Sequence, residues 1–141
     1  SFLASFQGDE NSTLIYANGA NSDANDFAIT PFAQATLSSC ASSVNGQFHV
    51  PEDMTATALY ANVNPDPGAD GVGFDVQLWV DGSAIAGCSC ELRGVAGVFD
   101  CFDSSCDADI DLGESVCVLL TEVGSAATPT TFQLGIEVQK R

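Results

Sequence analysis

The chain has 141 residues, of which 45% are hydrophobic and 16% charged, a composition typical of one packed domain and not of a disordered chain. Nineteen acidic residues oppose three basic ones, Arg93, Lys140 and Arg141, and give a net charge of -16. Such a charge repels phosphate groups and anionic lipids, so it argues against nucleic-acid partners and against membrane partners.

The first predicted element is the N-terminal stretch SFLASF, in which Phe2 and Phe6 fall on one face of a strand and Leu3 on the other. A terminal strand with this much apolar surface aggregates unless it is paired. We therefore expect residues 1–20 to form an assembly arm, paired either with an edge of its own domain or with a neighbouring copy of the chain. Residues 21–141 are expected to form the remaining domain.

Further along the chain, the apolar residues recur with a period of two, which predicts strands. The clearest case is residues 72–80, where apolar side chains alternate with Asp75, Gln77 and Trp79. Dipeptides typical of hairpin turns occur at Asn45-Gly46 and Asp81-Gly82, and Pro- and Gly-rich loops span 64–71 and 124–130. The predicted strands are 12–17, 34–43, 47–50, 59–63, 72–80, 83–91, 95–102, 107–112, 115–122 and 132–138. Their even spacing predicts an all-β antiparallel sandwich of jelly-roll type. The expected core residues are Leu59, Val63, Phe74, Val76, Leu78, Phe132, Leu134 and Ile136.

Residues 48–138 carry a pattern of strand, Pro-Gly loop and strand ending in an Asp-Gly hairpin. A turn at Gly113-Glu114 then opens a strand of alternating aliphatic residues. This run resembles the jelly-roll domains of phage and virion appendage or decoration proteins, and those of bacterial extracellular fibre subunits. The resemblance implies a subunit of an extracellular, cell-surface or virion assembly with no catalytic site.

Six cysteines allow a metal site, a redox site or disulfides. The spacings C-x-C at Cys88 and Cys90 and C-x4-C at Cys101 and Cys106 lack the paired C-x-x-C knuckles of zinc sites and have no histidine nearby. The C-x-x-C of redox sites is also absent. The even count therefore predicts structural disulfides, although six cysteines allow 15 pairings.

Geometry favours one of these pairings. The stretch RGVAG (93–97) can turn the chain and lay two strands side by side as a hairpin. A bond from Cys90 to Cys101 would staple that hairpin. Cys88 with Cys106 would extend the staple, and Cys40 with Cys117 would tie an early strand to a late one.

Acidic side chains alternate along residues 107–111, which raises the question of a calcium site. An EF-hand loop needs glycine at its sixth position and glutamate at its twelfth, where this chain has Leu112 and Val118. We favour a strand with Ala108, Ile110 and Leu112 inward and the aspartates in solvent. The alternative is a calcium ion held by oxygen ligands, the one cofactor that the sequence suggests. Its ligands would be Asp107, Asp109, Asp111 and Glu114, with Asp66 and Asp70 as a weaker second set.

Trp79 and Leu119 are predicted on the outward face of their strands, and large apolar side chains in that position indicate a covered face. The expected cover is another subunit or the N-terminal arm, and the competing interpretation is a tryptophan that stacks on sugars. No G-x-S-x-G nucleophile motif is present, and the single histidine, His49, is explained by an edge or interface position. We therefore expect a non-enzymatic subunit that associates with copies of itself through its arm and sheet faces. The alternative is a carbohydrate- or receptor-binding jelly roll.

Overall fold

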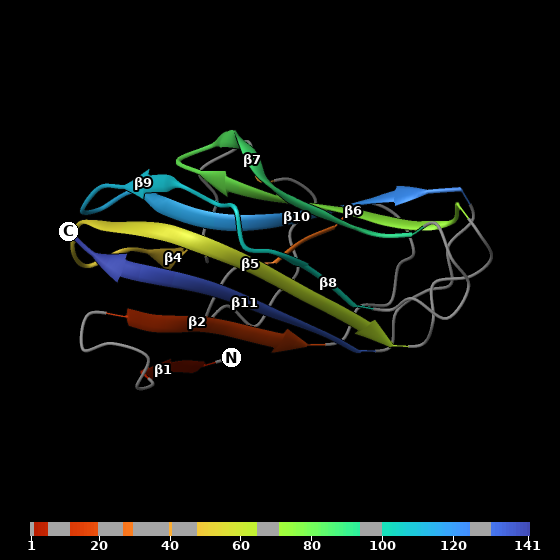
Figure 1. Ribbon diagram of the computed structural model, residues 1–141, viewed down its shortest axis with the longest axis horizontal. Helices are drawn as coiled ribbons and strands as arrows, with labels where there is room; N and C mark the ends of the chain where they lie inside the picture. The colour runs from red at the N-terminus through yellow and green to blue at the C-terminus, as the bar shows by residue number, and fades with distance from the viewer. Residues whose placement is uncertain are drawn as a thin grey trace.

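The computed structural model describes residues 2–5, 12–19, 27–29, 40, 48–64, 71–93, 100–124 and 131–141. Within these residues every regular element is a β-strand, and the strands form two antiparallel sheets that enclose one core (Figure 1). The predicted all-β antiparallel fold is confirmed at this level.

Sheet A has six strands. Its path runs from β1 (Phe2–Ser5) through β2 (Ser12–Gly19), β11 (Thr131–Lys140) and β5 (Met54–Asn64) to β8 (Asp100–Asp103), and β9 (Ala108–Ile110) also pairs with β5. Sheet B has five strands. Its path runs from β3 (Phe27–Ile29) through β10 (Ser115–Val123) and β6 (Gly73–Val80) to β7 (Ser83–Leu92), and β4 (Phe48–His49) also pairs with β10.

The core lies between the two sheets and follows from the alternation of the strands. On β6, Phe74, Val76 and Leu78 are fully buried, whereas Asp75 and Gln77 between them are half-buried. Successive side chains of a strand point to opposite faces of its sheet. The apolar residues at every second position therefore gather on the face that points to the core. The sheet A side of the core is made by Leu59, Ala61, Val63, Leu134, Ile136 and Val138. The predicted core residues are buried, except Phe132, whose side chain lies outside the described residues.

The Asp81-Gly82 dipeptide turns the chain between β6 and β7, as predicted. Both residues have positive φ, 49° and 80°, which is the requirement of a type I′ hairpin turn. The Asn45-Gly46 dipeptide lies outside the described residues. So does most of the predicted strand 34–43, of which only Cys40 is described, in a bend. The short strand β3 was not predicted, because its three described residues are too few to show a period.

The N-terminal strands belong to sheet A. β1 pairs with β2, and β2 pairs with β11 from Ser12 to Gly19 (Figure 1). The described part of the expected arm thus has a partner within its own chain, which was one of the two pairings considered. β1 is the last strand of the sheet, and contact of the arm with another copy stays a prediction.

The region around Cys90 and Cys101 is not the hairpin expected from the sequence. β7, which carries Cys90, pairs with β6 in sheet B, and β8, which carries Cys101, pairs with β5 in sheet A. The chain crosses from one sheet to the other between these strands. The hairpin prediction was wrong because sequence spacing shows that two strands are near each other but not whether they share a sheet.

Candidate functional site

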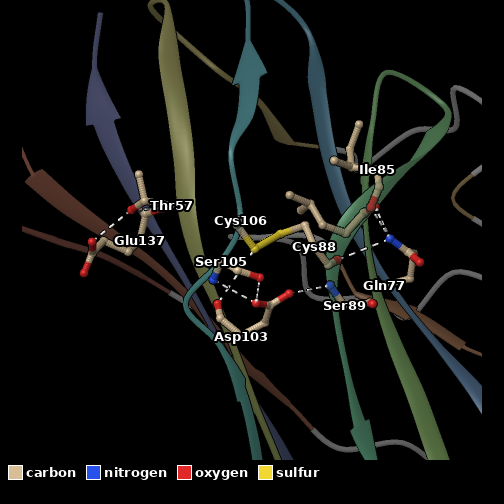
Figure 2. The surroundings of a disulfide bond; sticks show 10 residues. Thr57, Gln77, Ile85, Cys88, Ser89, Asp103, Ser105, Cys106 and Glu137 are labelled. Carbon is tan, nitrogen blue, oxygen red and sulfur yellow. Dashed lines mark hydrogen bonds between the residues drawn. A yellow bond between two sulfur atoms is a disulfide. The ribbon is translucent and has the colours of Figure 1, made fainter.

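All six cysteines are in disulfides, Cys40–Cys117, Cys88–Cys106 and Cys90–Cys101, the pairing that geometry favoured. Cys88 on β7 and Cys106 in the segment between β8 and β9 are both buried in the core (Figure 2). Because β7 belongs to sheet B and β8 and β9 to sheet A, this disulfide and Cys90–Cys101 join the two sheets across one edge of the sandwich. Their role in the structure is to hold the sheets together.

Asp103 lies beside these disulfides and connects the same two sheets. Its carboxylate accepts hydrogen bonds from the backbone N–H of Ser89 on β7 at 3.1 Å and from the N–H and hydroxyl of Ser105 at 2.8 and 2.6 Å (Figure 2). The bonds from Ser105 hold the pKa of Asp103 below its usual value, with a smaller contribution from Ser89. Sequence reasoning missed this residue, since one aspartate among many acids carries no distinctive signal.

Gln77 stabilises a bulge at the same edge. The register of β6 with β7 passes from Gln77 opposite Ser89 to Trp79 opposite Ala84, so residues 85–88 of β7 lie across from Leu78 alone. The side-chain amide of Gln77 donates to the carbonyls of Ile85 and Cys88 (Figure 2). It therefore gives a side-chain donor to two carbonyls in the irregular part of the ladder.

Trp79 and Leu119 pack against the Cys40–Cys117 disulfide on the outer face of sheet B. Both side chains are half-buried, and the indole nitrogen of Trp79 is buried without a hydrogen-bond partner among the described residues. Part of the expected cover is thus a disulfide of the same chain, while β1 and β2 of the arm lie in sheet A. A tryptophan packed in this way does not present its N–H to a sugar.

The four acids proposed as calcium ligands do not converge. Asp109 accepts from Thr55 at 2.9 Å and lies 3.7 Å from Arg141, which also binds Asp111. The bond to Asp111 raises the pKa of the Arg141 guanidinium. Glu114 accepts from the backbone N–H of Asp111 at 2.8 Å, and Asp107 is exposed. Across the described residues no three His, Cys, Asp or Glu side chains are placed to hold a metal ion. Asp66 and Asp70 lie outside those residues.

The favoured strand is present as β9, with Ala108 and Ile110 buried and the aspartates exposed. Leu112 was predicted inward and is 65% exposed instead. The reason is that β9 ends at Ile110 and Leu112 lies in the turn before Gly113. His49 is exposed on β4, and its Nδ1 lies 2.9 Å from the carbonyl oxygen of Gly113 in the same turn.

The outer face of sheet A carries the remaining candidate site, a hollow lined by Ala58, Tyr60, Phe102, Gly135 and Glu137. Phe102 is 63% exposed although it is a large apolar side chain. The neighbours of Tyr60 along β5, Leu59 and Ala61, are buried in the core, so Tyr60 belongs to the outer face.

The hollow is part of a row that crosses five strands. Register places Tyr60 opposite Phe102 on one side and opposite Gly135 on the other. Gly135 is in turn opposite Tyr16, which is opposite Phe2. Directly opposed residues of antiparallel strands share a face of the sheet. We call this set, Phe102, Tyr60, Gly135, Tyr16 and Phe2, the aromatic row.

Sequence reasoning identified Phe2 as an assembly residue but missed Phe102 and Tyr60. The row becomes visible only when the register of neighbouring strands is known. That register depends on which distant strands pair, and the sequence does not show this. Leu3, the second predicted assembly residue, is opposite Ile15 on β2. Phe6, the third, lies outside the described residues.

No model of a known protein family matches the chain, and no curated protein matches it in sequence. Among the described residues no helix is long and apolar enough to cross a membrane. The geometry of the two sheet faces is therefore the basis for assigning a function.

Proposed function

We propose that the chain is a non-enzymatic structural subunit of an extracellular, cell-surface or virion assembly, and that its copies associate through the outer face of sheet A. The aromatic row is the observation that carries this proposal. The exposed ring of Phe102 beside Tyr60, on a sheet face where the register adds further aromatic positions, is the kind of apolar surface that marks an interaction site.

A second copy is the occupant that the row favours. Read across the sheet, the row is Phe–Tyr–Gly–Tyr–Phe and is symmetric about Gly135. A two-fold contact places the same patch of each copy against itself, so it needs a surface that complements itself. With a two-fold axis along β11, position 60 of one copy faces position 16 of the other, and position 102 faces position 2. Register positions of equal residue type are therefore opposite each other in this arrangement.

The N-terminal strand joins the same surface. β1 places Phe2 at one end of the aromatic row, and Phe102 on β8 stands at the other end. The arm and the sheet face, which the sequence analysis treated as two assembly elements, would then act as one surface.

The disulfides support an extracellular location, and the strand order supports the jelly-roll type of sandwich. Three disulfides that use every cysteine are typical of a protein that folds in an oxidising, extracellular compartment. From β2 onward the chain passes repeatedly between the sheets: β2 is in sheet A, β3–β4 in B, β5 in A, β6–β7 in B, β8–β9 in A, β10 in B and β11 in A. This repeated crossing supports the jelly-roll type.

The test is the molecular mass in solution of two matched variants. Phe102→Ser removes the exposed ring from the aromatic row, and Leu112→Ser removes an equally exposed side chain from a turn. We expect the first variant to dissociate to monomers in sedimentation velocity and the second to associate like the wild type. Deletion of residues 1–8 should also give a folded monomer. A Phe102→Ser variant that assembles normally would refute the proposed contact.

A carbohydrate- or receptor-binding module is the second candidate function. It is favoured by the exposed ring of Phe102 beside Tyr60 and by the next row of the same register, which holds Asn62, Gln133 and Asp100. Rings that stack on a sugar and amides that bond its hydroxyls are a recurrent combination in binding sites. A wild-type monomer that binds a neutral glycan on an array, with loss of binding in Phe102→Ser, would favour this function over assembly.

A further inference from the structure

Glu137 lies in the surface that the proposed association would cover. It is opposite Ala58 on β5 and Leu14 on β2, next to Gly135 of the aromatic row, and it lines the hollow with Tyr60 and Phe102. Its Oε1 accepts a hydrogen bond from the hydroxyl of Thr57 at 2.9 Å, the one side-chain partner that the described residues give it (Figure 2). Covering the row with another copy therefore removes water from this carboxylate.

Each lysine and arginine side chain of the chain is already paired with acids other than Glu137. Arg93 binds Asp75 at 2.7 Å and Glu91 at 3.2 Å on sheet B. Arg141 binds Asp111 and lies 3.7 Å from Asp109, and Lys140 lies 3.4 Å from Glu52. These three are all the lysines and arginines of the sequence.

Within the part of the chain that the structure describes, the other titratable groups around Glu137 are not cations either. β5 brings Tyr60 to the hollow, and β2 has Tyr16 at the adjacent register position. β8 contributes Phe102, and β9, which extends the pairing of β5, carries Asp109, already engaged with Thr55. His49, the single histidine, is on β4 of sheet B beside the carbonyl of Gly113.

A carboxylate that loses water without gaining a cation is strongly destabilised in its charged form, and the neutral acid is favoured. We propose that association of the chains through the aromatic row takes up a proton at Glu137, so that acidification drives assembly. This inference rests on the proposed function, because it needs the face to be covered by a copy.

The expected size follows from proton linkage. Each Glu137 that is ionised in the free chain and protonated in the complex raises the association constant about tenfold per unit decrease in pH. A two-fold contact buries two such residues, which gives up to about a hundredfold per unit.

Acidification also lowers the net charge of -16 and weakens repulsion between copies, so the experiment needs a control for charge alone. Glu137→Gln removes the titrating group and keeps an oxygen that accepts from Thr57. Asp81→Asn removes the same charge at an exposed position in the turn between β6 and β7 of sheet B, where asparagine also tolerates the positive φ. The association constants of the wild type and both variants are measured by sedimentation velocity from pH 4.5 to 7.5 at constant ionic strength.

We expect Glu137→Gln to associate at least tenfold more tightly than the wild type at pH 7.5 and to lose most of the pH dependence. Asp81→Asn should keep the slope of the wild type. A Glu137→Gln variant with the wild-type slope would overturn the inference, and so would one that associates more weakly at every pH, since that result indicates a cation from the partner. Association that does not depend on pH would refute proton uptake at Glu137 alone. A wild type that is monomeric at every pH would refute the proposed function as well.

Discussion

Removing the Cys88–Cys106 disulfide tests directly whether the two disulfides at one edge of the sandwich hold its sheets together. The variant Cys88→Ala/Cys106→Ala deletes a bond that joins β7 of sheet B to the β8–β9 segment of sheet A, with both cysteines buried. Its matched control is Cys90→Ala/Cys101→Ala, which deletes the neighbouring staple, whose cysteines are only partly buried.

Loop closure sets the magnitude. A separation of 18 residues corresponds to about 3 kcal/mol of chain entropy in the unfolded state. The Cys90–Cys101 bond lies inside this loop and shortens the effective loop to about 8 residues, which lowers the contribution to about 2.5 kcal/mol. Two buried sulfur atoms are also lost from the core, at a cost of about 1 kcal/mol. We therefore expect a loss of about 3 to 4 kcal/mol, a large part of the stability of a typical domain.

The assay is urea unfolding under non-reducing conditions, with mass spectrometry to verify that the other two disulfides remain. The midpoint of thermal unfolding should fall by roughly 10 °C. The control variant should lose about 2.5 kcal/mol, because the remaining Cys88–Cys106 bond shortens its effective loop to the same length of about 8 residues and its own cysteines lie at the rim of the core. A loss below about 1 kcal/mol in Cys88→Ala/Cys106→Ala would refute the view that this bond holds the two sheets together.

Three further predictions concern the same sandwich. Asp103→Asn should cost about 1 kcal/mol at pH 7. Because the folded protein lowers the pKa of Asp103, this stability is present above the unfolded value of about 3.9 and is lost as the pH falls through the folded value. Acid titrations of the variant and the wild type should therefore converge, and a gap that persists at pH 2 would contradict the role given to Asp103. Gly73→Ala should cost about 3 kcal/mol or more in chemical unfolding, because a Cβ there would lie 1.9 Å from the carbonyl oxygen of Leu92. Gly71→Ala is its control, since that Cβ meets nothing within 4 Å and costs only the strain of a positive φ, about 1 kcal/mol. Gln77→Leu should cost about 1 to 3 kcal/mol by the same measurement, because two carbonyls of the bulge lose their donor; an unchanged midpoint would show that water replaces the amide.

Several features of this protein follow from the sequence alone. The alternation of apolar residues in 72–80 and 132–138 is a local property, since neighbouring side chains of a strand point to opposite faces. It was therefore enough to predict the strands, and in 72–80 the inward residues as well. The Asp81-Gly82 turn is local in the same sense, because both residues tolerate positive φ.

Tertiary structure decided which strands are neighbours. This changed the interpretation of both the disulfides between β7 and the β8–β9 segment and the surface proposed for assembly. Two cysteine-bearing strands close in sequence were expected in one hairpin, but β7 and β8 lie in different sheets, so the disulfides join the two sheets at one edge of the sandwich instead. Leu112 has the right phase for the core, but its strand ends before it.

The aromatic row is the clearest case. Phe2, Tyr16, Tyr60, Phe102 and Gly135 are spread over 134 residues of sequence, and no local pattern relates them. They form a row only because β2 pairs with β11 and β11 with β5 in one particular register, which is set by hydrophobic burial across the whole sandwich. A shift by one residue would send each strand's outward set into the core. The surface proposed for assembly is thus a property of strand pairing, and the sequence alone determines only which residues are available to form it.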